Sequence, residues 1–413
     1  MNLIDLLSFT GTLKTIGGFL LAIVILLAMV TIHEFGHYVA GKALGFKINE
    51  FSVGFGPALF KRRSKKTGEL FALRLVPLGG YCAFDGEDEV DDEEEKKPDQ
   101  DSPFEELPES QTGSQTENDG VGKKEEFEYP QPRGERFNDQ PPWKRIIVLI
   151  AGATMNYLLA VCLIILMFAS VGRPLYSVME RPAEVPPAAT EYTLIDETPV
   201  EKELLAVGDV ILKIDGRNVY MITDYIDALD GKKAGEWVPV TVLRGEEKRT
   251  VWIQLAKNAD FKNLSDTETL LHSMGIYGLA PTIERQGFFP TIGHSFGYSV
   301  KIGGTVLRSL GELLTGKIGI KSMGGPVTTI SVTAEAASSG WLSFLNIAAF
   351  IGVNLAVFNL LPVPALDGSK VIFCLIEWIR KKPVNRKVES MIHFIGILFL
   401  FGFAILVDLL HLF

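Results

Sequence analysis

The residues best suited to chemistry in this chain are His33, Glu34 and His37, in the pattern His-Glu-Phe-Gly-His. Two histidines four positions apart share one face of an α-helix, so both imidazoles can reach one zinc ion. A glutamate beside the first histidine is placed to act on a water bound to that ion. The pattern predicts a metalloprotease site. Two helical histidines that only hydrogen-bond to neighbours are the structural alternative.

An apolar run over residues 15–32 leads directly into this motif. Ionisable groups within or beside a membrane-spanning segment are costly and are functional by default. Only six histidines occur in 413 residues, and two of them lie here. Both observations favour the zinc site over the structural alternative.

The composition indicates a membrane protein, with 47% hydrophobic residues and a positive mean hydropathy. The acidic excess behind the net charge of −10 is confined to one segment, because residues 85–129 hold 19 Asp and Glu against 4 Lys. The rest of the chain gives no reason to expect a nucleic-acid partner. The isolated Cys82, Cys162 and Cys374 predict neither a disulfide framework nor a cysteine metal site. The first residues lack the basic start of a cleavable signal peptide.

Four runs with few charges are long enough to cross a bilayer core of ~30 Å, which takes ~20 helical residues. They cover about residues 15–39, 146–172, 341–361 and 391–413. Lys and Arg cluster between the first and second runs and between the third and fourth. Because basic residues stay on the cytoplasmic side, both termini are predicted outside the cell.

Asp367 is the predicted third metal ligand. The first and third runs cross in the same direction, so their C-terminal ends share a depth near the cytoplasmic face, and Asp367 follows the third run. Pro362 and Pro364 break the helix just before it, and open backbone at membrane depth must be buried in protein or line a wet cavity. Two imidazoles and a carboxylate leave one position for water, as hydrolytic zinc sites require. A helix-ending turn capped by Asp367 is the alternative.

Together, the His-Glu-x-x-His helix and the segment Asn-x-x-Pro-x-Pro-x-Leu-Asp-Gly at residues 359–368 resemble the site-2 protease family of intramembrane zinc metalloproteases. The likeness is greatest to the bacterial RseP/RasP group with a single PDZ domain, and it extends over the chain apart from residues 85–140. It implies an intramembrane zinc endopeptidase of the bacterial inner membrane. The substrates expected of such an enzyme are single-span membrane proteins, such as anti-sigma factors or signal-peptide remnants. An upstream site-1-type protease would clip them first, and this enzyme would then cut them near the cytoplasmic face.

The resemblance also implies further site residues. Asn359 would help to stabilise the charge that develops during cleavage. A Gly-x-Gly loop near the active site corresponds to residues 54–56, and Asn156 lies in a stretch similar to a family motif whose proline is replaced here by Ala153. The expected substrate-binding residues are Gly54, Phe55, Gly56, Asn156, Pro362 and Pro364.

The expected fold is a mostly α-helical polytopic membrane protein with four transmembrane helices, a membrane-associated β-hairpin or sheet and one extracytoplasmic PDZ-like α+β domain. The β region carries alternating β-formers and a turn signal at residues 65–68, and an open strand edge there could hold an extended substrate. The PDZ-like pattern is Gly-Asp-x-Ile-x-x-Ile-Asp-Gly at residues 208–216. That domain could bind peptide ends or act as a size filter.

The predicted order along the chain follows from these motifs. Residues 85–140 are acidic and poor in aliphatic side chains, which predicts a disordered cytoplasmic insertion. Apolar residues at four-three spacing from Phe296 to Leu314, with Lys301 and Arg308 elsewhere on the helix, predict an amphipathic helix on the outer membrane surface. Packing of that helix against the PDZ-like domain is the alternative. The segments are 1–45 (first span with the zinc motif), 46–84 (β region), 85–140 (insertion), 141–172 (second span), 177–284 (PDZ-like domain), 285–340 (amphipathic helix and linker), 341–380 (third span with Asp367) and 381–413 (fourth span).

Two other functions fit the same sequence. One is a non-catalytic membrane scaffold whose PDZ-like domain binds peptides and whose zinc is structural. The other is a membrane zincin of a different family, which would take its third ligand from a downstream glutamate. Glu50 and Glu69 are available for that role.

Overall fold

The structure is a computed structural model that describes residues 3–87, 129–180, 193–195, 198–200, 205–256 and 271–412. The chain forms two compact units. The first comprises Met1–Leu158, Gly316–Ser338 and Leu355–Phe413, and the second Leu159–Thr315 and Ser339–Asn354.

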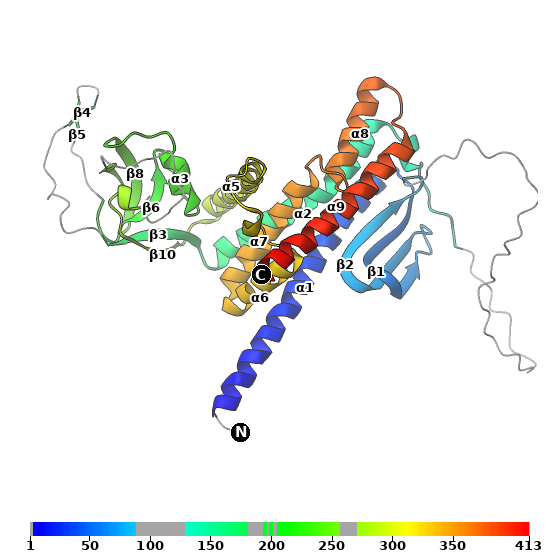
Figure 1. The fold of residues 1–413 in the computed structure, drawn as a ribbon, viewed down its shortest axis with the longest axis horizontal. Coiled ribbons are helices and arrows are strands. Elements are labelled where there is room, and N and C mark those ends of the chain that lie inside the picture. Colours follow the sequence, from blue (N-terminus) through cyan, green and yellow to red (C-terminus); the bar gives the residue numbers. More distant parts are fainter. Residues whose placement is uncertain are drawn as a thin grey trace, which may run out of the picture. The chain divides into compact units, whose positions relative to one another are not determined.

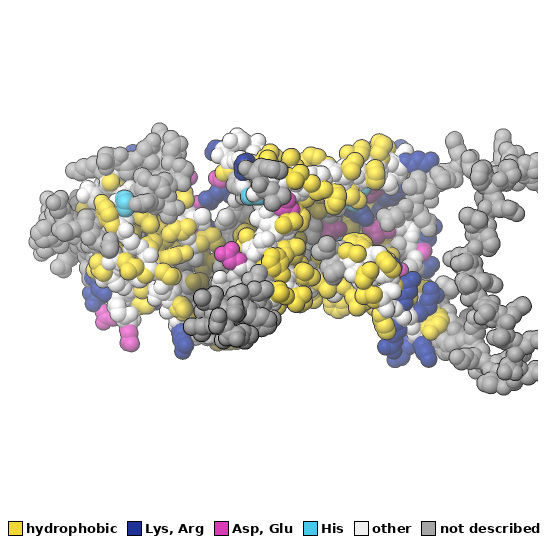
Figure 2. All heavy atoms as spheres, turned by 60° about the horizontal axis from the view of Figure 1, so that its bottom comes forward, with side chains coloured by type: hydrophobic (Ala, Val, Ile, Leu, Met, Phe, Trp, Pro, Cys, Tyr) yellow, Lys and Arg dark blue, Asp and Glu magenta, His cyan; other side chains and the backbone are white. Residues whose placement is uncertain are grey.

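Four helices of the described chain are long and apolar enough to cross a membrane: α1 (Leu3–Leu44), α2 (Pro142–Ser170), α7 (Trp341–Asn359) and α9 (Arg386–Leu412). The described chain therefore contains the predicted number of helices that could span a membrane. Several helices extend past the predicted runs, because a helix continues into the polar interface while a hydropathy window stops at the first charges. Hydrophobic side chains cover much of the helical surface in Figure 2, and basic side chains gather at the end where β1 and β2 lie in Figure 1.

The predicted β region consists of β1 (Ile48–Arg63) and β2 (Leu70–Phe84), which are antiparallel and lie beside α1 (Figure 1). Both strands bend, so the first half of β1 pairs with both halves of β2. Phe51, for example, faces Cys82 on one side and Phe71 on the other. The glycines at 54 and 56, with φ of +84° and +82°, allow the bend in β1. The four segments thus make one small curved sheet.

The predicted disorder of residues 85–140 is wrong at both ends of that segment. Residues 88–128 lie outside the described chain, but residues 129–140 are ordered and include the 3₁₀ turn η1 (Phe137–Asp139). Phe137 is buried against Phe46 and Phe84. The backbone of Glu135 also donates to Gly45 O at 3.0 Å and accepts from Lys47 N at 2.9 Å. The average composition of residues 85–140 predicts disorder, because it does not reveal that the single residue Phe137 is buried by distant aromatic residues.

Two further helices complete the first unit. Helix α8 (Asp367–Arg380) follows α7 after a turn, and α6 (Pro326–Ser339) follows the 3₁₀ turn η2 (Ile320–Ser322). Asp408 of α9 accepts hydrogen bonds from the backbone N–H groups of Val327 and Thr328, at 3.0 and 3.3 Å. A carboxylate on a membrane-spanning helix thus satisfies the first free donors of α6.

The second unit contains an antiparallel sheet in the order β10-β3-β6-β8-β9, with β7 (Arg217–Asn218) beside β6. The strands are β3 (Arg173–Glu180), β6 (Val210–Ile214), β8 (Trp237–Arg244), β9 (Glu247–Gln254) and β10 (Gly278–Glu284), and β4 (Thr193–Ile195) pairs separately with β5 (Thr198–Val200). The expected strands and the helix between them, α3 (Thr223–Leu229), are present. Their core is formed by alternating apolar residues with Tyr225 at its centre. The sheet begins at Arg173, four residues before the predicted boundary.

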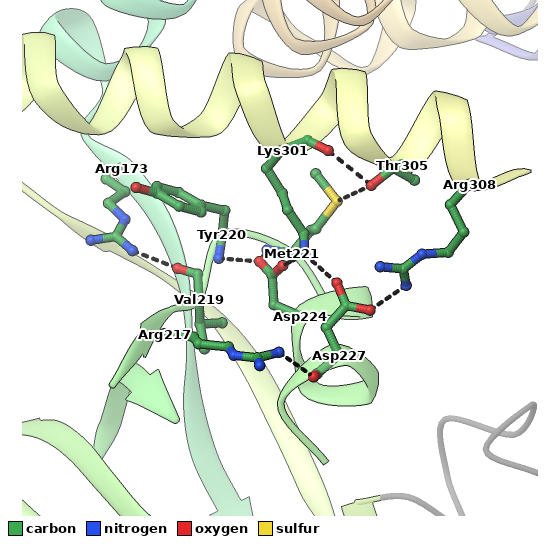
Figure 3. Close-up of polar contacts among 10 residues, drawn as sticks. All are labelled: Arg173, Arg217, Val219, Tyr220, Met221, Asp224, Asp227, Lys301, Thr305 and Arg308. Carbon is green, nitrogen blue, oxygen red and sulfur yellow. Dashed lines mark hydrogen bonds and ion pairs between the residues drawn. The ribbon is translucent and has the colours of Figure 1, made fainter. Parts of the chain in front are cut away.

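Helix α5 (Phe288–Leu314) packs on this domain through a cluster of charges, shown in Figure 3. Lys301 forms ion pairs with Asp224, at 2.5 Å, and with Asp227, which also pairs with Arg308. We call Asp224, Asp227, Lys301 and Arg308 the α5 ion-pair cluster. The apolar residues predicted to face the membrane lie elsewhere on the helix, and Phe296, Val300, Leu307 and Leu314 are exposed.

Candidate metal centre

Helix α1 places the imidazoles of His33 and His37 together. It runs without interruption from Leu3 to Leu44, so residues four apart lie one turn apart on the same face. The Nε2 atoms of the two rings are 3.1 Å from each other, and both side chains are buried. The Nε2 atoms of two imidazoles on one helix thus face one point.

The turn from α7 to α8 brings the carboxylate of Asp367 to that point. Asn359 ends α7, and Asp367 is the first residue of α8. Ala365 adopts a positive φ of +80°, an unusual conformation for a residue with a Cβ. Gly368 lies so close to Leu361 that a Cβ would come within 2.2 Å of its carbonyl oxygen. The turn is therefore tightly packed, and the residue that follows it, Asp367, faces the two histidines.

The three side chains form the group that we call the metal cluster: His33, His37 and Asp367. Oδ2 of Asp367 lies 3.0 Å from Nε2 of His33 and 3.4 Å from Nε2 of His37. Three donors of a tetrahedral zinc site, each about 2.0–2.2 Å from the ion, lie roughly 3.3–3.5 Å apart. The observed separations are close to this spacing.

Neighbouring groups hold each imidazole in an orientation that suits a ligand. Nδ1 of His37 lies 2.8 Å from the carbonyl oxygen of Val148 on α2, to which only a protonated Nδ1 can donate. Nε2 then keeps its lone pair for a metal. Nδ1 of His33 lies 3.4 Å from the side-chain amides of both Asn156 and Asn359. An amide whose oxygen faces the ring would accept the Nδ1 proton in the same way.

Two glycines let α1 and α2 approach closely at the metal cluster. A Cβ on Gly36 would lie 2.4 Å from the carbonyl oxygen of Ala151, and one on Gly152 would lie 2.3 Å from Nε2 of His37. Small residues at such positions allow helices to pack with their backbones in close approach. Sequence reasoning missed both roles, although the glycines stand within or next to the recognised motifs.

Glu34 lines a cavity of about 270 Å³ beside the metal cluster, together with His33, Asn156, Asn359 and Asp367. Gly79 and Gly80 of β2 also line it, and a Cβ on Gly80 would lie 3.3 Å from Cγ of Glu34. The glycines leave room for a ligand next to the carboxylate. The carboxylate of Glu34, the metal cluster and strand backbone thus share one cavity.

Several predicted substrate-binding residues lie outside this lining. Gly54, Phe55, Gly56, Pro362 and Pro364 are absent from the residues that line the cavity. Phe55 does pack directly over Gly79, which lines it. Pro364 instead lies against Gly396 of α9. Asn156 is the only residue of that predicted set that both contacts a histidine of the metal cluster and lines the cavity.

A glutamate third ligand from Glu50 or Glu69 is wrong for the described chain. Glu50 pairs with Arg74 at 2.6 Å, and Glu69 accepts hydrogen bonds from Tyr38, Lys42 and Thr67. Among the described residues, the metal cluster is the single group of three potential ligands that converge. Both glutamates stabilise the β region instead.

The donor set fits zinc. Two nitrogen ligands and one oxygen ligand are typical of catalytic zinc sites that keep a fourth position open, and the cavity lies on that side. Oδ2 of Asp367 is buried and has no hydrogen-bond donor among the described residues. A metal ion would compensate this oxygen, since a buried carboxylate without a partner is costly.

The sequence profile of Peptidase family M50 matches residues 21–403. The "Regulator of sigma-W protease RasP" of Bacillus subtilis (strain 168) is 27% identical over 420 residues, which covers 92% of this chain and 94% of the relative. The "Zinc metalloprotease RasP" of Bacillus licheniformis is 26% identical over 416 residues, covering 90% and 93%. The family match includes both the helix of His33 and the turn before Asp367. The chain therefore belongs to peptidase family M50, the site-2 proteases.

Proposed function

We propose that the protein is an intramembrane zinc endopeptidase in which His33, His37 and Asp367 hold the metal. The observation that carries this proposal is the convergence of their three donor atoms within 3.4 Å beside a cavity that Glu34 lines. A zinc ion held by these three residues would supply a Lewis acid that polarises the scissile carbonyl and lowers the pKa of water. Family membership and relatives named as zinc metalloproteases support the assignment.

In this mechanism Glu34 moves the proton. Its carboxylate takes a proton from the attacking water and passes it to the nitrogen of the leaving amine. Asn156 and Asn359 are positioning residues, because both lie beside Nδ1 of His33. Asn359 also lines the cavity, where its amide can donate to the oxyanion as the peptide carbonyl becomes tetrahedral.

The substrate binds as an extended strand. Peptide bonds in a transmembrane helix are locked in hydrogen bonds, so the helix must unwind before attack. Residues 80–84 of β2 pair only with β1 in the described chain, so one backbone edge is open to strand addition next to the cavity. Gly54, Phe55 and Gly56 would support this edge through the contact of Phe55 with Gly79. Pro362 and Pro364 shape the turn that presents Asp367.

The proposed topology puts both termini outside and the metal cluster near the cytoplasmic face of the bacterial inner membrane. Basic residues between the first and second spans and between the third and fourth support it. Substrates are then single-span membrane proteins already clipped by a site-1-type protease. One relative is named a regulator of sigma-W, which supports anti-sigma factors as the substrate class. The sheet domain, predicted at residues 177–284 and beginning at Arg173 in the structure, would act as a PDZ-like filter or peptide-binding module on the outer side.

Two substitutions test the proposal in purified full-length protein. Glu34→Gln should lower the rate of cleavage of a single-span model substrate by about 10²–10⁴-fold and leave the zinc content unchanged, because it removes only the proton carrier. Asp367→Ala should lower the zinc content and the cleavage rate together.

The same measurements separate the rival functions. If the protein is instead a scaffold with structural zinc, Glu34→Gln should leave any detected cleavage unchanged. Full zinc content in Asp367→Ala would show that the ligand set is wrong. Lys382→Gln, an exposed change outside the cavity, is the matched control and should affect neither measurement.

A further inference from the structure

Arg74 of β2 lies in the small curved sheet and is not among the residues that line the cavity beside Glu34. Its side chain is 18% exposed, and its guanidinium donates four hydrogen bonds to other parts of the sheet. An arginine carries five N–H donors in a fixed planar arrangement, so several bonds from one side chain fix the relative positions of the groups that accept them. The mechanism described above gives Arg74 no role.

Three of these hydrogen bonds join three neighbouring segments of the sheet. Nε donates to Oγ of Ser52 at 2.8 Å. Nη2 donates to Oε1 of Glu50 at 2.6 Å and to the hydroxyl oxygen of Tyr81 at 2.7 Å. Ser52 pairs with Tyr81 on one side and with the segment that carries Arg74 on the other. The side chain of Arg74 therefore reaches across the central segment to the one that forms the open edge of the sheet.

The fourth hydrogen bond holds the loop at residues 54–56. Nη1 of Arg74 donates to the carbonyl oxygen of Gly56 at 2.9 Å. Gly54 and Gly56 both have positive φ, and glycine has more conformational freedom to lose than any other residue. The nearest atom to a Cβ built on Gly56 would be 3.7 Å away, so close packing does not fix this residue. A hydrogen bond from a charged donor is therefore well placed to define the conformation of the loop.

The ring of Phe55, between the two glycines, connects this loop with the cavity. It stacks on the ring of Tyr81, with centroids 6.4 Å apart and planes inclined by 22°. Cζ of Arg74 lies 5.6 Å from the centre of the same Tyr81 ring. Phe55 also packs over Gly79, which lines the cavity of the candidate metal centre. Arg74 thus holds the neighbours of Phe55 on two sides, the backbone at Gly56 and the ring of Tyr81.

We propose that Arg74 is a positioning residue for substrate binding, because it fixes the loop at residues 54–56 relative to the open edge at residues 80–84. This inference rests on the proposed function, in which a substrate segment adds to that edge as an extended strand. A loop and an edge that are ordered before binding need not be ordered by the substrate, which increases its affinity. Arg74 belongs neither to the metal cluster nor to the cavity lining. Its loss should therefore raise KM and leave kcat nearly unchanged.

The test is steady-state cleavage of a single-span model substrate by the purified, zinc-loaded, full-length protein in detergent micelles. Arg74→Lys keeps a positive charge beside Glu50, but one ammonium group cannot replace the planar set of donors that also reaches Gly56. We expect KM to rise about tenfold, the loss of roughly one charge-assisted hydrogen bond. The value of kcat should change less than about twofold. The zinc content should stay the same.

Glu69→Gln is the control for a loss of stability without a loss of positioning. Glu69 is buried in the turn between β1 and β2, outside both the loop and the open edge, and accepts hydrogen bonds from Tyr38 and Thr67. Its substitution should lower the thermal stability of the protein and leave KM unchanged. An equal rise of KM in Glu69→Gln and Arg74→Lys would show that any loosening of the sheet weakens substrate binding, and it would overturn the proposal.

Substrate affinity in an inactive protein gives a second measurement, which does not depend on turnover. In the Glu34→Gln background, Arg74→Lys should raise the Kd of the model substrate by the same factor as KM. An unchanged Kd, or a fall in kcat at constant KM, would contradict a positioning role. If Arg74→Lys fails to fold, the double variant Glu50→Gln/Arg74→Gln, which removes both charges of the ion pair, is measured in its place and should show the same rise.

The two proposals fail in distinguishable ways. Cleavage that persists at full rate in Glu34→Gln would contradict the proposed function itself. Cleavage that depends on Glu34 but keeps the same KM in Arg74→Lys would contradict only the role of Arg74.

Discussion

The metal cluster and the α5 ion-pair cluster are both groups of polar side chains in close contact, but their charges are satisfied in different ways. In the α5 ion-pair cluster every carboxylate has a cation, and Oδ2 of Asp224 also accepts from the backbone N–H groups of Tyr220 and Met221, at 2.6 and 2.9 Å. In the metal cluster two ring nitrogens and a carboxylate oxygen converge on one point without a donor among the described residues for that oxygen. The first arrangement is complete as protein, whereas the second leaves a carboxylate oxygen that the proposed zinc ion would compensate.

This difference distinguishes polar groups that stabilise a fold from polar groups that do chemistry. Fully compensated ion pairs fix how α5 packs on α3, and their removal should affect stability before activity. Converging donors with few protein partners are expected where a ligand binds. Asp224 is as buried as the two histidines, so burial alone does not distinguish the two kinds of site. The pattern of hydrogen-bond partners does.

The largest effect among these predictions is expected for Gly152→Ala, which should disturb the metal cluster and leave the α5 ion-pair cluster unchanged. The new Cβ would lie 2.3 Å from Nε2 of His37, so the ring or α2 must shift. Misplacement of a catalytic group by about 1 Å can cost about 10²-fold in rate. We expect the zinc content to fall and cleavage to drop by about that factor, while amide hydrogen exchange of α5 stays unchanged.

The matched control for Gly152→Ala is Thr154→Val, two residues further along α2. Thr154 is exposed, and its hydroxyl bonds only within its own helix. Zinc content and cleavage should stay at the level of the unchanged protein. If Gly152→Ala also keeps both, the close approach of α1 and α2 is not needed for the metal cluster.

The sequence predicted the metal cluster better than the residues around it. The spacing of His33 and His37 and the shared depth of two parallel spans were sufficient to choose Asp367, because helix geometry and bilayer thickness are regular. Val148 and Gly152 were not identifiable as partners of His37, since a backbone carbonyl and a missing Cβ leave no signal in residue type. The cavity-lining role of Gly79 and Gly80 depends on how β2 bends, which no local pattern specifies.

The fold shows the same division. The membrane-capable helices were recognised from the length of their apolar runs, which matches the thickness of a bilayer. The strands were recognised from alternating apolar residues, which match the two faces of a sheet. The order of residues 129–140 depends on the burial of Phe137 by Phe46 and Phe84, which are distant in sequence. Lys301 and Arg308 were recognised only as the polar face of α5, and their partners on α3 could not be named without the tertiary structure.

A smaller and different effect is expected from Asp227→Asn in the α5 ion-pair cluster. The amide cannot pair with Lys301 and Arg308, and hydrogen bonds to charged groups contribute about 1.5–3 kcal/mol. Because Arg308 is partly exposed, we expect about 1–2 kcal/mol lower stability of the packing of α5, measured by amide hydrogen exchange of that helix. Zinc content should not change.

Arg249→Gln provides the matched control for Asp227→Asn. It removes an exposed ion pair with Glu247 on β9, worth at most a few tenths of a kcal/mol. Exchange of the α5 amides should be the same as in the unchanged protein. Loss of zinc in Asp227→Asn would contradict the division of roles between the two clusters.

The smallest effect expected is that of mild acid on α5. Burial acts against ionisation of Asp227, but hydrogen bonds from Arg308 and Lys301 prevail and hold the pKa of its carboxyl below the ordinary value of 3.8. A carboxyl whose pKa is lowered by folding contributes stability above its unfolded pKa and loses it as the pH falls through the folded value. Exchange of the α5 amides, corrected for intrinsic rates, should therefore be constant from pH 7 to pH 5 and should increase only below about pH 4. An increase already at pH 6 would mean that a group other than Asp227 controls the packing of α5. Asp227→Asn should make the transition at low pH smaller, because Asp224 then remains as the carboxylate partner of Lys301.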